Sequence, residues 1–347
     1  MKKLIKILGI ALAVLVVFVA AFVAFVVTSD QGKLKLPVAH KPFFEGQARD
    51  SYPSMLHVED NRLVNAHGET VRLRGAMPVD PAKLHAENRF KRRFFEELAN
   101  TGANVIRIPV HPANWQNDPD YLWRYLDPSV QWAGELGMYV VIDWHSIGNV
   151  ETGTAPLMPE LYAHTQTMTA DFWKLTAAYF HQAPHVLFEV FNEPQGISAN
   201  RWRENASQLV QTVRAQGAPQ PVIVGGVDYA RSLAWVIDTP ISGENIVYAA
   251  HIYPTHPVDM WPIYFGMVAE KYPVLITEWG FMDENPSNEQ PYLNGSAESF
   301  GIPLMDFLDE RGIGWVACWY DDGWQPPMWA DGNESLTRFG QFVLAQL

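Results

Sequence analysis

The chain has 347 residues, of which 48% are hydrophobic and 18% are charged, and these values are typical of a globular protein with a sizeable core. The formal net charge is −13 and no basic patch is present, which argues against a nucleic-acid partner. The single cysteine, Cys318, excludes an internal disulfide, and its apolar neighbours in GWVACWY indicate a buried thiol without a catalytic role.

The chain begins with an uncharged apolar stretch, ILGIALAVLVVFVAAFVAFVV at residues 7–27, which follows several lysines. As a helix this stretch is about 30 Å long, close to the thickness of the hydrocarbon core of a bilayer, and it exceeds the usual apolar region of a cleaved signal peptide. We therefore expect residues 1–27 to be a transmembrane helix, an anchor or signal-anchor that contacts the lipid bilayer through residues 7–27. Cleavage at Val19-Ala20-Ala21, which leaves FVAFVV at the new terminus and gives a secreted protein, is the alternative.

Residues 28–55 contain prolines and polar residues with little periodicity, and we expect them to form a tether. A regular pattern begins at residue 56, where LHVEDNRLVNAHGETVRL predicts one or two short hairpins. We assign residues 56–347 to a single folded domain.

Within this domain, apolar strands alternate with helical segments, for example helices expected over 89–102, 171–182 and 200–217. This alternation predicts a parallel sheet covered by helices, and a closed (β/α)₈ TIM barrel, an α/β fold, is the natural choice. An open doubly wound sheet is the rival, but the Gly-rich phosphate loop that usually follows its first strand is missing. The expected strands are VRLRGA (71–76), NVIRIPV (104–110), MYVVIDW (138–144), VLFEVF (186–191), PVIVGG (221–226), NIVYAAHIY (245–253), PVLITEW (273–279) and GWVACWY (314–320).

Polar and aromatic side chains gather where these strands end. In a TIM barrel the active site lies at the C-terminal ends of the strands, so the pattern marks a site at that face. Polar residues scattered at random over a surface would not all fall at the same end of several strands. The strand-end residues are Arg107 on the second strand, His145 after the third, Asn192 and Glu193 after the fourth, His251 and Tyr253 on the sixth, Glu278 on the seventh and Trp319 on the eighth.

Two of these residues, Glu193 and Glu278, are expected to face one another across the barrel mouth. A pair of carboxyl groups, one of them kept protonated, is the arrangement that hydrolyses glycosidic bonds. Arg107 is able to keep a carboxylate ionised by its charge, and Trp319 offers a flat apolar face to a sugar ring. The residues alone thus indicate a glycoside hydrolase, with a barrel that only binds sugar as the alternative.

The ordered set of motifs resembles glycoside hydrolase family 5 of clan A, whose best-known members are cellulases. The resemblance rests on VIRIPV, IDWH, NEP, HIYP, ITEWG and the strand-eight tryptophan, and it covers roughly residues 56–347. It implies that Glu193 is the acid/base and Glu278 the nucleophile. It also implies supporting or substrate-binding roles for Arg107, His145, Asn192, His251, Tyr253 and Trp319.

This resemblance implies a retaining β-glycosidase that needs no cofactor and no metal. We expect a β-1,4-linked glucan as substrate, with a mannan, another β-glucan or a short oligosaccharide as alternatives. The loop after strand eight, YDDGWQPPMWADGN, departs from the common bacterial pattern and bears on the substrate. Its Trp324 and Trp329 are expected to contact neighbouring sugars, with a hydrophobic lid over the barrel as the alternative. No obligate protein partner is indicated. With the anchor retained, the catalytic domain is expected outside the cytoplasm, in the periplasm or on the cell surface.

One further acid, Glu189, lies inside the fourth strand. Because side chains alternate along a strand, residues 189, 191 and 193 are expected to share a face, which places Glu189 in the barrel interior below Glu193. A buried carboxylate needs a partner. Arg74 and Arg107 are the candidates, and Arg74 is the favoured one.

Overall fold

The computed structural model describes residues 37–46, 51–285 and 287–347. The transmembrane helix expected over residues 1–27 lies outside the described residues. Within the described ranges, no helix combines the length and the hydrophobicity needed to cross a bilayer.

The compact unit of the chain starts at His40, earlier than the expected domain start at residue 56. The backbone N–H of Phe44 donates to the carbonyl of Tyr179 over 2.9 Å, and the Phe44 ring is buried with its centroid 5.4 Å from that of Phe180. Burying a phenylalanine stabilises this attachment by removing apolar area from water. Residues 40–46, expected to be part of the tether, therefore belong to the folded domain.

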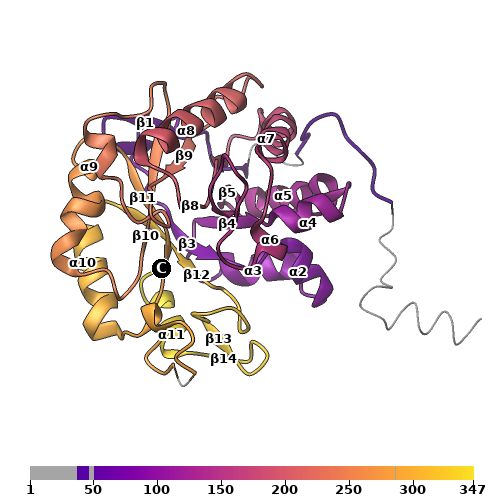
Figure 1. Ribbon diagram of the computed structural model, residues 1–347. Helices are drawn as coiled ribbons and strands as arrows, with labels where there is room; N and C mark the ends of the chain where they lie inside the picture. The colour runs from indigo at the N-terminus through magenta and orange to yellow at the C-terminus, as the bar shows by residue number, and fades with distance from the viewer. Residues whose placement is uncertain (1–36, 47–50, 286) are drawn as a thin grey trace, which may run out of the picture. The chain divides into compact units, whose positions relative to one another are not determined.

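Eight parallel strands close into a barrel, which confirms the predicted (β/α)₈ fold. The spatial order is β10-β11-β12-β3-β4-β5-β7-β9, so neighbours in sequence are also neighbours around the barrel (Figure 1). The barrel strands are β3 (Arg74–Met77), β4 (Val105–Val110), β5 (Tyr139–Trp144), β7 (Val186–Glu189), β9 (Val222–Gly225), β10 (Ile246–Ile252), β11 (Val274–Trp279) and β12 (Gly314–Cys318).

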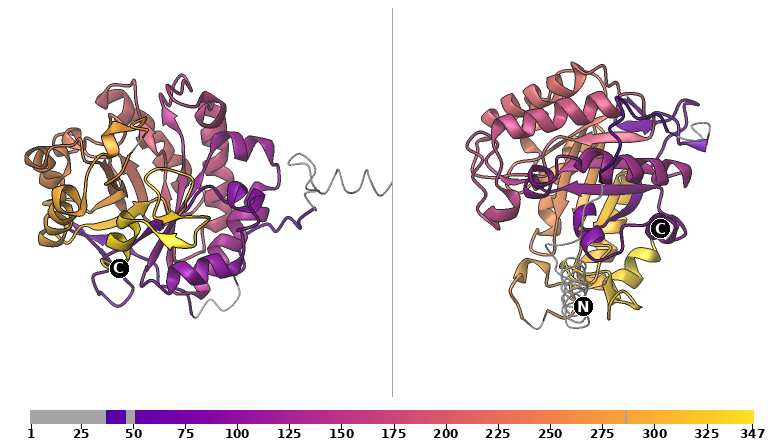
Figure 2. Two further views of the ribbon diagram at one scale, coloured as in Figure 1. Left: turned by 90° about the horizontal axis from the view of Figure 1, so that it is seen from below. Right: turned by 90° about the vertical axis from the view of Figure 1, so that its right-hand side faces the viewer.

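Helices surround the barrel on the outside, as the views in Figures 1 and 2 show. Many are short, and several turns are 3₁₀ or π in character. The α-helices are α2 (Pro81–Ala86), α3 (Arg92–Ala99), α4 (Pro112–Asn117), α5 (Asp127–Glu135), α6 (Pro159–Tyr162), α7 (Gln166–Phe180), α8 (Ala199–Arg214), α9 (Met267–Ala269), α10 (Ile302–Glu310) and α11 (Arg338–Leu344). The 3₁₀ and π turns are η2 (Leu122–Leu126), η3 (Ala234–Ile237), η4 (Val258–Met260), η5 (Pro262–Gly266), η6 (Pro291–Leu293) and η7 (Ala297–Gly301).

Helix α8 illustrates how the sequence produces these elements. Ser198 caps its N-terminus by accepting a hydrogen bond from the backbone of Arg201, which satisfies one of the free N–H groups of the first turn. Trp202, Leu209 and Val213 recur at helical spacing and are buried against the barrel. The apolar stripe thus fixes which face of the helix covers the sheet.

Three two-stranded sheets lie outside the barrel. Strands β1 (His57–Glu59) and β2 (Arg62–Val64) form the hairpin expected near the start of the domain. Strands β13 (Trp329–Ala330) and β14 (Ser335–Leu336) form a hairpin in the loop after β12. Strands β6 (Ile147–Gly148) and β8 (Glu193–Pro194) pair in parallel beyond the ends of β5 and β7.

Candidate active site

The two glutamates predicted to form a pair lie close together at the C-terminal end of the barrel. Glu193 is on β8 and Glu278 is near the end of β11. One oxygen of each carboxyl and one nitrogen of His251 all lie within 4.8 Å of one another. Carboxyl groups of retaining glycosidases are about 5–5.5 Å apart, whereas inverting enzymes leave about 6.5–9.5 Å for a water. The separation here is therefore close to that of the retaining enzymes and too short for the inverting arrangement.

Two local irregularities bring these side chains together. The barrel strand β7 ends at Glu189, and the chain then pairs Glu193 with Ile147 in the separate β6–β8 sheet. The register between β10 and β11 shifts between Ala250 and His251. Such a bulge re-aims side chains next to active sites, and here His251 reaches both the glutamate pair and β11.

The two glutamates have different hydrogen-bond partners. Glu278 accepts from Arg107 Nη1 at 2.7 Å and from the Tyr253 hydroxyl at 2.9 Å. Glu193 Oε1 lies 2.8 Å from Nδ1 of His251. Glu278 thus has two hydrogen-bond donors, one of them a guanidinium, whereas Glu193 faces a single ring nitrogen.

Burial, together with the neighbouring charge of Glu278, raises the pKa of Glu193 well above its usual value. Burial lowers the pKa of His251 well below its usual value, so this ring is neutral and leaves the Glu193 charge uncompensated. The site therefore favours the protonated form of Glu193, which is the form that a general acid requires.

Arg107 is the cation that neutralises this cluster. Its guanidinium is fully buried, 2.6 Å from Glu189, 2.7 Å from Glu278 and 3.1 Å from Asp143. Burial alone would lower the pKa of Arg107, but these three carboxylates raise it well above its usual value. Burial in turn raises the pKa of Asp143 and of Glu189 to about 7, against the opposing effect of Arg107.

The remaining predicted site residues lie around the pair. Asn192 Oδ1 accepts from Arg107 Nη2 at 2.8 Å, and Asn192 Nδ2 is buried with no partner among the described residues, so it is free to donate to a substrate hydroxyl. His145 Nδ1 lies 2.5 Å from Asp143 Oδ2. The Trp319 ring centroid is 5.6 Å from that of His145. The fold thus brings together all the residues that the sequence pattern selected.

The expected partner of Glu189 is corrected. Glu189 is fully buried, as expected, but it pairs with Arg107, whereas Arg74 Nη2 lies 3.0 Å from Asp309 at the protein surface. The register explains the difference, because Gly75 lies opposite Val105. Arg74 therefore starts its strand near the other end of the barrel, while Arg107 lies further toward the mouth.

Sequence reasoning missed two residues of the site. His111 directly follows β4, and its Nδ1 lies 3.0 Å from Asp80 while its ring centroid is 4.8 Å from that of His145. Its position at a strand end is the same signal that selected the other residues. Thr277 precedes Glu278 and is fully buried, with its hydroxyl donating to Glu189 over 2.8 Å. The register shift between β10 and β11 skips Thr277, whose hydroxyl lies 3.0 Å from Nε2 of His251. Thr277 is part of the motif ITEWG, but the motif gives no sign of this contact.

Glu193, His251 and Glu278 also form the one cluster of three or more potential metal-ligating residues in the described part of the chain. The surroundings suit paired-carboxylate chemistry better than a cation. The Arg107 guanidinium is 2.7 Å from Glu278 and repels a metal ion. Both nitrogens of His251 already face protein atoms, Glu193 Oε1 and the Thr277 hydroxyl.

The tryptophans near the strand ends divide into two groups. Trp144 and Trp279 are fully buried and pack against Phe172 and Trp315, so they belong to the core. Trp324, in the loop after β12, has its ring centroid 4.9 Å from that of Trp319 and is partly exposed. Trp324 therefore extends the aromatic surface that begins at Trp319.

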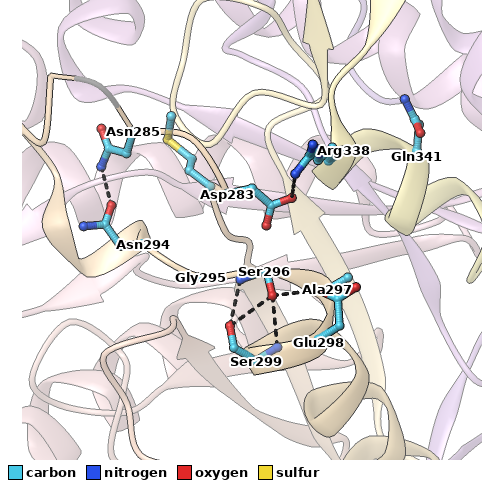
Figure 3. A pocket seen from close by; sticks show the side chains of 11 residues that line it. Asp283, Asn285, Asn294, Gly295, Ser296, Ala297, Glu298, Ser299, Arg338 and Gln341 are labelled. Carbon is cyan, nitrogen blue, oxygen red and sulfur yellow. Dashed lines mark hydrogen bonds and ion pairs between the residues drawn. The ribbon is translucent and has the colours of Figure 1, made fainter.

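A separate hollow of about 760 Å³ lies in the loop that follows β11 (Figure 3). Its lining contains none of the predicted site residues. Ser296 and Ser299 exchange capping hydrogen bonds at the start of η7, and Asp283 lies 4.0 Å from Arg338. These polar groups are thus paired among themselves and order the loop.

Comparison with known proteins agrees with the glutamate pair described above. A family model described as cellulase (glycosyl hydrolase family 5) matches residues 64–322. Endoglucanase N of Pectobacterium atrosepticum is 27% identical over 271 residues, which cover 75% of this chain and 56% of that protein. Endoglucanase 5 of Pectobacterium carotovorum subsp. carotovorum is 26% identical and covers 75% of this chain and 49% of its own length. The chain thus spans about half the length of the curated relatives it matches.

Solved structures show the same barrel. A β-glucanase from Saccharophagus degradans, determined in complex with cellotetraose, superposes with a TM-score of 0.82 at 28% identity and covers 90% of this chain and 98% of its own. The catalytic domain of a Thermobifida fusca endoglucanase superposes with a TM-score of 0.69 at 22% identity, covering 84% and 96% of the two chains.

Proposed function

The chain belongs to glycosyl hydrolase family 5, and from that premise we propose that it is a retaining β-glycosidase that hydrolyses a β-1,4-linked glucan. The observation that carries the proposal is the pair formed by Glu193 and Glu278, whose oxygens lie within 4.8 Å of one another. The endoglucanases among the relatives, and the β-glucanase solved with cellotetraose, support the glucan as substrate class. A mannan or another β-glucan is the alternative within the family.

In this mechanism Glu193 donates its proton to the glycosidic oxygen while Glu278 attacks the anomeric carbon. Arg107 and Tyr253 donate hydrogen bonds that hold the Glu278 carboxylate in position until the glycosyl–enzyme bond forms. Glu193, now a carboxylate, then removes a proton from the water that releases the sugar. Asn192 holds a free Nδ2 donor for a hydroxyl of the sugar that is cleaved.

The stereochemistry of the first product tests this mechanism. We expect hydrolysis of an aryl β-cellobioside to release the β-anomer first, because two displacements at the same carbon restore its configuration. Proton NMR of the anomeric signals during the first minutes of reaction, before mutarotation, measures this. Initial release of the α-anomer would contradict the assigned roles and the retaining separation of the glutamates.

The tryptophans are expected to differ in their effect on short and long substrates. Trp319→Ala should lower kcat/KM on a disaccharide and on a hexasaccharide alike, because Trp319 lies beside His145 at the centre of the site. Trp324→Ala should lower it about tenfold on the hexasaccharide alone, equivalent to the roughly 1.5 kcal/mol of one aromatic contact. Trp329, the other tryptophan expected to contact sugars, packs against Tyr320 with ring centroids 5.7 Å apart, and Trp329→Ala tests that expectation on the same two substrates. Equal losses for Trp324→Ala on both substrates would contradict the expectation that Trp324 contacts a neighbouring sugar.

We also propose that residues 7–27 anchor the enzyme in a membrane with its catalytic domain outside the cytoplasm. The uncharged length of this stretch supports the proposal, as does the expected location of glucan substrates. The enzyme should then remain in the membrane fraction after high-salt and carbonate washes, since a spanning helix is not released by screening charge. Mature enzyme in the culture medium, with its N-terminus beyond Ala20, would show a cleaved signal peptide instead.

A further inference from the structure

A buried chain of hydrogen bonds connects the proposed acid/base to Glu189. Glu193 Oε1 lies 2.8 Å from His251 Nδ1, and His251 Nε2 lies 3.0 Å from the Thr277 hydroxyl. The Thr277 hydroxyl donates to Glu189 Oε1 over 2.8 Å. Glu189 Oε2 accepts from Arg107 Nε at 2.6 Å, and Arg107 Nη1 reaches Glu278. The proposed acid/base and nucleophile are therefore linked beneath the site through Glu189.

We propose that Glu189 is a positioning residue that acts through Thr277 and His251 to keep the acid/base Glu193 protonated. The inference rests on the proposed glycosidase function and adds a residue to its machinery. Glu189 does not line the mouth, because it is fully buried and its oxygens contact only Arg107 and Thr277 in the hydrogen bonds of the described structure. Its effect must pass through these two neighbours.

The direction of each hydrogen bond follows from the two carboxyl groups, Glu189 and Glu193, at the ends of this series of hydrogen bonds. An ionised carboxylate accepts only, so Thr277 donates to Glu189 and has a lone pair left for the Nε2–H of His251. Neutral His251 then presents a lone pair at Nδ1, toward Glu193. A lone pair favours the protonated carboxyl over the carboxylate, which raises the pKa of Glu193.

Glu193 and Glu189 thus share one proton through this series of hydrogen bonds, and the proton can reside on either glutamate. Transfer to Glu189 reverses every donor and acceptor, and it turns Nδ1–H of His251 toward an ionised Glu193. The surrounding charges decide between the two states. Arg107 lies 2.6 Å from Glu189 and stabilises its charge, whereas Glu278 repels a charge on Glu193. Above about pH 7 Glu189 is ionised, and the proton lies on Glu193.

The ionisable groups around each end agree with this assignment. Glu189 is faced by Arg107 from β4 and by Asp143 from β5. The groups that act on Glu193 are Glu278, Arg107, Asp143 and Glu189, and those that feel its charge include Tyr162, Tyr229, Tyr253 and Tyr292. Arg107 is the cation in this set, and it contacts Glu189 rather than Glu193.

The test is the pH profile of kcat/KM on p-nitrophenyl β-cellobioside, because its alkaline limb reports the acid of the free enzyme. In Glu189→Gln the amide NH₂ donates to Thr277. This reverses the direction of the hydrogen bonds from Thr277 to His251 and from His251 to Glu193, so that Nδ1–H of His251 points toward Glu193. We expect the alkaline limb to move to lower pH by about one unit. Thr277→Val should move it in the same direction, because His251 is then free to donate to Glu193. Thr277→Ser, which keeps the hydroxyl, should restore the wild-type limb.

Thr176→Val provides a matched control, because Thr176 is a buried threonine on α7 whose hydroxyl has no partner among the described residues. Its alkaline limb should stay at the wild-type position. Folding of each variant is checked by its thermal unfolding midpoint. If the limb stays in place in Thr277→Val and only the midpoint falls, Glu189 is structural and the proposal is overturned, whether or not Glu189→Gln folds. A wild-type chain inactive on every β-glycoside would overturn the function itself, which is a separate outcome.

Discussion

Replacing Glu278 by alanine is expected to reduce kcat/KM on an aryl β-cellobioside by on the order of 10⁶-fold, the scale on which enzymes lose activity when a nucleophile is removed. The physical reason is that no other carboxylate lies where Glu278 receives hydrogen bonds from both Arg107 and Tyr253. Glu193→Ala should lose less, about 10²–10⁴-fold, because it removes general acid–base assistance only. Initial rates under matched conditions measure both losses.

Azide distinguishes the two roles. In Glu278→Ala a small anion can enter the vacated space and attack from that side, which should give an α-glycosyl azide. In Glu193→Ala the glycosyl–enzyme still forms, and azide entering on the opposite side should give the β-glycosyl azide. NMR of the azide products identifies each anomer. The same anomer from both variants would contradict the assignment of acid/base and nucleophile.

Replacing Arg107 by alanine is expected to lower the free energy of unfolding by about 3–5 kcal/mol at neutral pH, as breaking a buried ion pair does. Asp143, Glu189 and Glu278 then lose the cation that all three contact. Arg93→Ala is the matched control, since Arg93 is exposed and pairs with Glu97 at the surface, where such a pair contributes about 0–1 kcal/mol. Urea unfolding followed by tryptophan fluorescence measures both variants.

The pH dependence follows from the same carboxyls. Asp143 and Glu189 have pKa values of about 7 in the folded chain, above the values of roughly 4 expected for an unfolded one. Between these values the folded state binds more protons, so the stability of the wild-type protein should fall as the pH rises from about 4 to about 7. The deficit of Arg107→Ala should be larger at pH 8 than at pH 5, where these carboxyls carry protons. A deficit independent of pH would show that Arg107 stabilises by packing alone.

The order of the barrel strands and the identity of the glutamate pair could be read from the sequence. Each barrel strand is a short apolar run followed by polar residues, and parallel strands place those residues at one edge whatever the detailed packing. For this reason Arg107, Glu193 and Glu278 could be selected without coordinates. The expected strand over 186–191 was less accurate, because β7 ends at Glu189 and Glu193 belongs to β8.

The side-chain alternation used to place Glu189 therefore holds only in part. Glu189 does point into the barrel, but Phe191, expected on the same face, packs against Trp202 of α8 on the outside. The break between β7 and β8 resets the alternation before Glu193, so the glutamate still reaches the mouth. A local pattern predicts a strand but not the residue at which the strand loses its partner, because pairing depends on the neighbouring chain.

What the sequence by itself determined is the fold, the family and the residues at the strand ends, since these follow from periodicity and from motifs within short stretches. What only the tertiary structure decided is which of these residues touch. Because of the register of β3 against β4, Arg107 forms the ion pair with Glu189, and Arg74 lies at the surface. Where the register of β10 against β11 shifts, His251 lies between Glu193 and Thr277. Such contacts join segments far apart in the chain, and a shift of one residue in strand register changes them all.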